Sequence, residues 1–276
     1  MSAAFDFDLM FSRAYRAAIT APPLLWVAVF LLIPYAILFC YSFWSVSSSQ
    51  TIVHSWTLDN YRTATTMNAV RSALTNSLVL GVATATIGVA LMGLLSWIIY
   101  RSRVPGSGLI EYIVMFPQAV PRLVFAFGMM WAWLIFPIPI YGTLWLLLIA
   151  YLTVFLPLGI RTISGVMLQV DRSLEESAQM CGAPWAYRIR TITMPLLRPG
   201  LVAAWLLLFV ASVRELGASI LLMGPNAKVI TPAIVESWFA SSAELTAAMA
   251  LIQTLVVASA MALFVTLTRR AQLVHE

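Results

Sequence analysis

Six long apolar stretches limit what this chain can fold into. A helix needs about 20 apolar residues to cross the hydrocarbon core of a bilayer. The chain is also 61% hydrophobic and only 10% charged, whereas soluble domains carry about 25% charged residues. The sequence therefore predicts an all-α fold, a polytopic membrane helix bundle with six transmembrane helices. The expected spans are 23–44, 74–100, 108–136, 141–165, 201–223 and 246–268.

The positive charges predict the orientation of these spans. Cytoplasmic loops of membrane proteins are enriched in Lys and Arg. If the N-terminus faces the cytoplasm, only Arg62, Arg71 and Lys228 lie outside. We therefore expect both the N-terminus and the C-terminus, together with the 168–200 loop, to be cytoplasmic. The basic residues placed inside are Arg13, Arg16, Arg101, Arg103, Arg161, Arg172, Arg188, Arg190, Arg198, Arg269 and Arg270.

The chain divides into one membrane domain and two short ends. The expected membrane domain covers 23–270, and 271–276 is a C-terminal tail. Residues 1–22 form a cytoplasmic or interfacial N-terminal segment that mixes aromatic and charged side chains. This segment is either a short helix lying in the membrane interface or a frayed terminus. The apolar run that follows is longer than the core of a cleavable signal peptide, so we expect it to be the first span.

The 168–200 loop has the composition of a helical hairpin. Asp171 can cap a helix, and Glu175 and Glu176 lie in the first turns, where the helix dipole favours negative charge. Gly182 is typical of a helix end, and Pro184 of the start of a second short helix that ends before Pro195. Such a hairpin either is bound by a soluble partner or packs on its own bundle.

The same loop carries a spaced motif. It resembles the loop of binding-protein-dependent ABC importer permeases, in which Glu-Ala-Ala is followed after three residues by Gly and after nine more by Ile-x-Leu-Pro. All the spacings match here, with Ser177 in place of Ala and Met194 in place of Leu. The matching residues are Glu176, Ser177, Ala178, Gly182, Ile192, Met194 and Pro195.

The resemblance covers about 23–270 and implies a function. It implies a permease subunit in a bacterial inner membrane that is not itself an enzyme. The loop, with Glu175 beside the motif, would couple to a cytoplasmic ABC ATPase dimer. A second permease subunit, identical or different, would complete the path. An extracytoplasmic substrate-binding protein would dock where 45–72 and 224–245 lie.

Charged residues inside the predicted spans are candidates for the translocation path. Arg214 and Glu215 lie near the middle of the 201–223 stretch, where a charge is costly and usually faces a bundle interior or a watery path. They are either a gate or a structural ion pair. Arg122 follows Pro117 and Pro121, which break a helix as transporter pathways often do, but it could also snorkel to the surface.

The sequence offers little support for covalent chemistry. It has no phosphate-binding loop, and its two cysteines and two histidines form no metal-ligand cluster. We expect no cofactor, no metal and no nucleic acid. An ion-gradient-driven carrier or an intramembrane enzyme stays open as the alternative, with Arg122, Arg214 and Glu215 as its only intramembrane ionisable residues.

The substrate is suggested only by resemblance. The run Glu215-Leu-Gly-Ala218 resembles Glu-Phe-Gly-Ala of ferric iron, sulfate and molybdate permeases. The first span and the run from Trp56 to Tyr61 resemble polyamine permeases, and organophosphonate importers share features with both. The sequence thus favours a polyamine or ferric iron.

Overall fold

The computed structural model describes residues 13–46, 52–102 and 104–273. Most of 1–22, Arg103 and the end of the C-terminal tail lie outside the described residues, so expectations about them stay predictions. The described chain is mostly helical, as expected. Its elements are α1 (Arg13–Val27), η1 (Ala28–Leu32), α2 (Ile33–Ser42), β1 (Trp44–Val46), β2 (Ile52–Trp56), α3 (Asp59–Thr66), α4 (Asn68–Tyr100), α5 (Ser107–Met115), η2 (Phe116–Gln118), α6 (Arg122–Ile135), α7 (Leu144–Val154), α8 (Leu156–Met167), α9 (Ser173–Met180), α10 (Trp185–Arg188), η3 (Ile189–Thr193), α11 (Met194–Val213), α12 (Ser219–Leu222), α13 (Ile230–Ala240) and α14 (Ala243–Leu273).

Four helices are long and apolar enough to cross a membrane unbroken. They are Ile19–Ser42, Asn68–Tyr100, Trp185–Val213 and Ala243–Thr266, and the count rises to six if each of two bent pairs is one span. The first bent pair turns by 102° between Gln118 and Arg122, because prolines at 117 and 121 remove backbone donors and disfavour helix at the preceding residue. The 108–136 stretch is therefore not a straight helix.

The fifth apolar stretch differs most from its prediction. The second helix of the 168–200 hairpin does not end before Pro195, since Trp185–Val213 is one continuous helical rod of 29 residues. A π-helical turn, η3, ends two residues before Pro195, and such a wider turn accommodates a residue that lacks a backbone donor. The helix ends at Val213 rather than at 223, so Arg214 and Glu215 lie in a break of this apolar stretch and not in the middle of a continuous helix.

The core is formed by α4, α8 and α11, which pack closely against one another. Their backbones approach where glycine faces a neighbouring side chain. A Cβ at Gly159 would lie 2.1 Å from Met92 Sδ, and one at Gly200 would lie 2.8 Å from Val166 Cβ. Small residues at such contacts are the usual way membrane helices gain packing energy.

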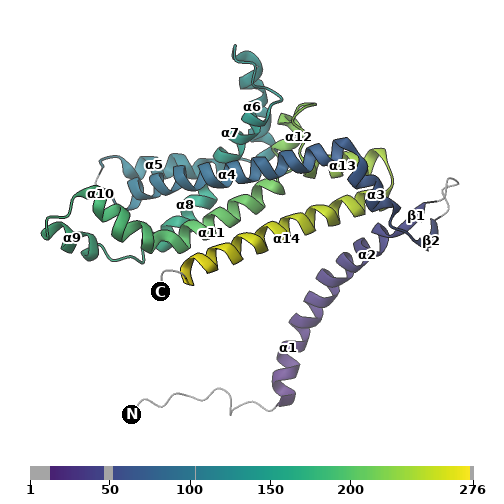
Figure 1. Cartoon of the computed structure of the whole chain (residues 1–276), viewed down its shortest axis with the longest axis horizontal. Coiled ribbons are helices and arrows are strands. Elements are labelled where there is room, and N and C mark those ends of the chain that lie inside the picture. The colour runs from purple at the N-terminus through teal and green to yellow at the C-terminus, as the bar shows by residue number, and fades with distance from the viewer. Residues whose placement is uncertain (1–12, 47–51, 103, 274–276) are drawn as a thin grey trace.

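The two ends of the bundle carry different segments. The antiparallel strands β1 and β2, a small addition to an otherwise helical fold, lie with α3 and α13 at one end (Figure 1). Asn76 donates a hydrogen bond of 2.9 Å to the Lys228 carbonyl, which ties the start of α4 to the segment before α13. Helices α9 and α10 lie at the opposite end.

The N-terminal helix is the least covered part of the described chain. None of the most apolar window of Ile19–Ser42 is buried. It contacts α14 through α2, and Figure 1 shows α1 projecting away from the bundle. Its exposed side chains include Leu24, Trp26, Phe30 and Tyr35.

Candidate functional site

The hairpin between α8 and α11 has the predicted helix–turn–helix form. Helices α9 and α10 are joined at Gly182, whose φ of +82° lies in the left-handed region that glycine adopts without strain. The Ser173 amide donates a hydrogen bond of 2.9 Å to Asp171 Oδ1 at the start of α9. This bond lowers the pKa of the Asp171 carboxyl below its usual value.

Arginines fix the hairpin to the bundle. Arg101 Nη2, at the end of α4, donates to the carbonyl oxygens of Met167, at 3.1 Å, and Val170. Within the hairpin, Arg188 Nη1 donates to Gln179 Oε1 at 2.6 Å. The sequence presented these arginines only as markers of orientation, but their planar donors also hold the loop in one conformation.

The two adjacent glutamates of α9 face different surroundings. Glu175 is half-buried: Thr193 Oγ1 donates to its Oε1 at 2.9 Å, and Arg101 Nη1 lies 3.9 Å from the same oxygen. Glu176 is exposed. The Glu175 carboxylate therefore helps to hold the hairpin together, while the Glu176 carboxylate is accessible to another molecule.

The remaining predicted hairpin residues differ in their exposure. Ser177 and Pro195 are exposed, whereas Ala178 and Ile192 are partly buried. A recess of about 510 Å³ opens beside α9 and contains both glutamates. It is lined by Arg101, Arg172, Glu175, Glu176, Gln179, Met180 and Arg188.

A second charged site lies where helices break. Arg122, the first residue of α6, places Nη1 2.7 Å from Glu215 Oε2. The other carboxylate oxygen of Glu215 accepts the Ala218 amide at 3.1 Å. The Glu215 side chain is 1% exposed and the Arg122 side chain 59%. The structure thus brings together two of the three predicted intramembrane residues.

Arg214 does not join this pair. It ends α11 and is exposed, and it lines a separate cavity of about 440 Å³ together with residues of α13 and α14. Because the backbone leaves the helix after Val213, the neighbouring side chains of Arg214 and Glu215 point into different surroundings.

Three helix breaks meet at the Arg122–Glu215 pair. Arg122 follows the break between α5 and α6, Glu215 lies in the break between α11 and α12, and Phe155 occupies the 49° bend between α7 and α8. The Arg122 guanidinium carbon lies 5.5 Å from the centre of the Phe155 ring, within cation–π range. Discontinuous helices of this kind form substrate sites in many transporters.

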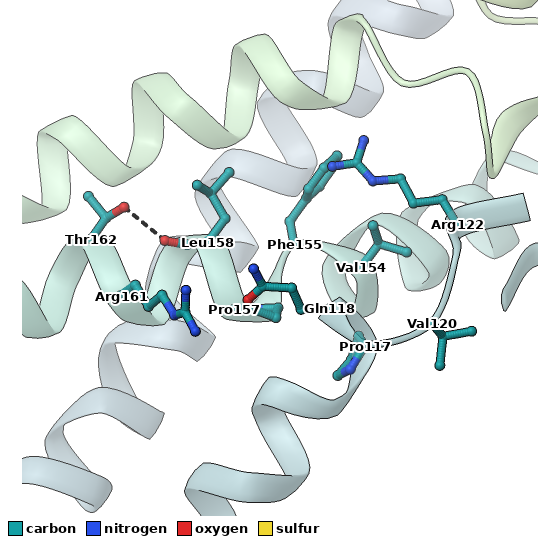
Figure 2. Close-up of a pocket in the computed structure, with 10 residues that line it drawn as sticks. All are labelled: Pro117, Gln118, Val120, Arg122, Val154, Phe155, Pro157, Leu158, Arg161 and Thr162. Atoms are coloured by element: carbon teal, nitrogen blue, oxygen red, sulfur yellow. Dashed lines mark hydrogen bonds between the residues drawn. The ribbon is translucent and has the colours of Figure 1, made fainter.

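A cavity of about 520 Å³ opens beside this pair, between the η2 turn, α6 and α8 (Figure 2). It contains Arg161, which the sequence placed on the cytoplasmic side. A lone arginine inside the 141–165 apolar stretch is the signal that could have identified it. The cavity is lined by Pro117, Gln118, Val120, Arg122, Val154, Phe155, Pro157, Leu158, Arg161 and Thr162.

Comparisons with known sequences find permease subunits of transport systems. Residues 90–273 match the family model described as binding-protein-dependent transport system inner membrane component. The chain is 30% identical to the trehalose transport system permease protein SugB of Mycobacterium tuberculosis, over 72% of each chain. It is 26% identical to the putrescine permease PotI of Escherichia coli over 75% of each. It is 29% identical to an Fe(3+)-transport permease of Haemophilus influenzae, but spans only 33% of that protein.

Solved structures share the fold. A bacterial ABC transporter that imports the polysaccharide alginate superposes with a TM-score of 0.74, over 92% of this chain and 95% of that one. The MetNI methionine ABC transporter gives 0.57, over 73% of this chain and 94% of the other. Both are 18% identical in sequence. With its apolar helices, its interrupted spans and its hairpin, the chain belongs to the binding-protein-dependent transport system inner membrane components, the permease subunits of ABC importers, which are not themselves enzymes.

Proposed function

We propose that this permease forms half of a translocation path and receives the motion of a separate ABC ATPase dimer through the 168–200 hairpin. The observation that carries the proposal is the contrast within α9, where Glu175 is held inside the hairpin and Glu176 is exposed. A loop braced from within can move as one body when a partner binds its outer face. The family assignment replaces the alternative of an ion-gradient-driven carrier or an intramembrane enzyme.

The recess beside α9 suits an ATPase subunit. An exposed carboxylate at its edge, Glu176, can accept charge-assisted hydrogen bonds from an arginine or from backbone amides of the partner. Gly182 leaves the tip of the hairpin narrow, because a Cβ there would meet nothing within 4 Å and the backbone is open to approach. Ser177, Ala178, Ile192 and Pro195 would complete the coupling segment, with Glu175 holding it in shape.

We propose six spans, each bent pair counting as one, within a membrane domain at 23–270. Residues 1–22 and the tail at 271–276 would then both lie in the cytoplasm of a bacterium, beneath its inner membrane. Two observations support this topology. The hairpin and the segments at 45–72 and 224–245 lie at opposite ends of the bundle (Figure 1), and the arginines gather on the hairpin side.

The exposed N-terminal helix supports a second permease subunit. Its apolar window is uncovered within this chain, and such a surface in a membrane bundle can contact lipid or another subunit. An extracytoplasmic binding protein would dock at the end that carries β1, β2, α3 and α13. One structural relative was solved with an alginate-bound periplasmic protein. Arg122 and Glu215 would gate the path, with Arg214 on the opposite wall of the helix break.

The experiment compares the effects of replacing each of the two glutamates. The permease is purified with its co-encoded ATPase, and co-purification, ATPase activity in proteoliposomes and thermal stability are measured for Glu176→Ala and Glu175→Ala. We expect Glu176→Ala to lose at least about tenfold of the coupled ATPase activity, a loss of about 1.4 kcal/mol, with an unchanged melting midpoint. Glu175→Ala should lower the midpoint, and Ser259→Ala on the exposed side of α14 should change neither the coupled activity nor the midpoint.

Two results would refute the proposal. The wild-type permease could bring down no ATPase, which would remove the assigned partner. Alternatively, Glu176→Ala could keep full coupling, which would place the contact elsewhere on the chain.

A further inference from the structure

We propose that the cavity between η2, α6 and α8 binds an anionic solute, so that the imported substrate carries a carboxylate, sulfate, phosphate or phosphonate group. The inference rests on the proposed function, because it takes this cavity to be part of the translocation path. It adds one residue, Arg161, that the sequence placed with the cytoplasmic arginines, and it selects anionic solutes from the wider range of substrates that the resemblance suggests.

The charged groups on the cavity wall are all positive. Of the ten lining residues, Arg122 and Arg161 carry charge and none is a carboxylate. Gln118 adds an amide that can donate hydrogen bonds. In Figure 2 the Arg122 guanidinium lies against the Phe155 ring, whereas Arg161 projects from α8 nearer to Gln118, and all three side chains line the one cavity. A solute entering here meets two cations and a donor.

The buried carboxylate does not cancel this charge at the wall. Glu215 is 1% exposed and is not among the lining residues, whereas Arg122 is 59% exposed. Arg122 therefore lies between the carboxylate and the cavity. One of its nitrogens bonds Glu215 Oε2, and the guanidinium has further N–H groups that can bind a second acceptor.

Arg161 supplies the unbalanced charge. Within the described part of the chain, its guanidinium makes no hydrogen bond or ion pair, and the residue is exposed on α8. Glu111, a carboxylate of α5, accepts a hydrogen bond from Tyr100 at 2.7 Å and does not line the cavity. A charge in a membrane span is costly. An unpaired arginine that faces a cavity is therefore expected to have a function there.

Two planar guanidinium groups match the oxygens of a carboxylate or phosphonate, which they bind through parallel N–H donors. The same groups repel a cation, since no carboxylate on the cavity wall offsets their charge. The cavity therefore disfavours the polyamine that the resemblance of the first span suggested. Ferric iron fits only as a complex with an anionic chelator.

The first test measures the local potential without knowing the substrate. Leu158, on the cavity wall, is replaced by cysteine in the full-length permease that carries Cys40→Ser and Cys181→Ser. The thiol is reacted with an anionic sulfonatoethyl and a cationic trimethylammonium-ethyl methanethiosulfonate. The anion-to-cation rate ratio, normalised to a small free thiol, should exceed by about tenfold the ratio at native, exposed Cys181, measured in a separate protein that carries Cys40→Ser alone, as expected for a cationic cleft.

Adding Arg161→Gln should bring the ratio at Leu158→Cys close to that at Cys181, and Arg161→Lys should preserve most of it. Equal ratios at the two cysteines, a ratio indifferent to Arg161→Gln, or no reaction with either reagent would each overturn the inference.

The second test distinguishes this inference from the proposed function. The importer, reconstituted with its ATPase and binding protein, is assayed with phosphonoacetate, putrescine and trehalose as charged and neutral probes. Stimulation of ATP hydrolysis by the anion, lost in Arg161→Glu, supports the inference. Stimulation by putrescine or trehalose alone contradicts it while leaving the permease function intact. No ATP hydrolysis under any condition contradicts the proposed function instead.

Discussion

The hairpin and the membrane interior each hold an arginine–glutamate contact, but with opposite burial. In the hairpin the arginine is hidden: the Arg101 side chain is 4% exposed and that of Glu175 21%. At the helix breaks the carboxylate is hidden: Glu215 is 1% exposed and Arg122 59%. In each case the buried ion depends on its neighbours, since an uncompensated charge in a low dielectric is costly. The exposed partner can instead turn toward water or a ligand.

The largest expected effect comes from Arg122→Gln. It leaves Glu215 buried with only the Ala218 amide as a donor, and losing one partner of a buried ion pair costs about 3 kcal/mol. We expect a clear drop in the thermal unfolding midpoint in detergent. Glu215→Gln should cost less, because Arg122 is already largely exposed. Equal losses for the two variants would show that burial does not decide the effect.

A somewhat smaller effect is expected for Arg101→Gln. The variant loses the bonds to the Met167 and Val170 carbonyls, and a hydrogen bond to a charged group contributes about 1.5–3 kcal/mol. Amide hydrogen exchange in α9 should accelerate while that in α4 stays slow. Arg190→Gln, which removes an exposed arginine of the same hairpin, serves as the control. Acceleration in both variants would mean that net charge, rather than the buried arginine, holds the loop.

Gly182→Ala should reduce stability by about 1 kcal/mol, because a left-handed backbone disfavours any residue with a Cβ. The matched control is Gly165→Ala in α8, where a Cβ meets nothing within 4 Å and φ is not positive. The control should be neutral or slightly stabilising. Thermal melting of both variants decides the point, and a neutral Gly182→Ala would mean that the hairpin tip relaxes freely.

The smallest effect is a pH dependence at Asp171. Its folded pKa is lowered by the Ser173 amide, so its contribution is present above the unfolded value of about 3.9. The contribution is lost as the pH falls through the folded pKa. Protection of the first α9 amides, measured against the intrinsic exchange rate at each pH, should therefore fall on acidification in the wild type and already be low in Asp171→Asn. An unchanged acid response in that variant would assign the effect to another group.

The hairpin was predictable because its determinants are local. The hydrogen bond from the Ser173 amide to Asp171 and the turn at Gly182 act within a few residues, and spacing alone predicts them, although the N-cap of α9 is Arg172 rather than Asp171. Hydropathy did not predict that the second hairpin helix continues past Pro195. The π-helical turn that accommodates the proline does not change the hydropathy of the segment.

The intramembrane site could be predicted only in part. Sequence identified Arg122 and Glu215 as costly charges, but not as partners, since 93 residues separate them. The break after Val213 contains no proline, so the apolar stretch appeared to continue through it. Arg161 lies inside a predicted span, but the distribution of positive charge placed it with the arginines of the cytoplasmic loops. Its position in the cavity was therefore not predicted.

The unbroken rod from Trp185 to Val213 has a mechanical consequence. At 1.5 Å per residue its 29 residues extend about 43 Å, from the turn after Gly182 to the break that holds Glu215. The rod includes the π-helical turn η3 and the prolines at 195 and 199, yet its backbone stays helical from end to end. In the proposed function, a push on the outer hairpin would reach the buried Glu215 carboxylate as a shift of this whole helix, and α6 contacts that carboxylate through Arg122. One helix would thus connect the surface proposed to bind the ATPase with the charges beside the cavity.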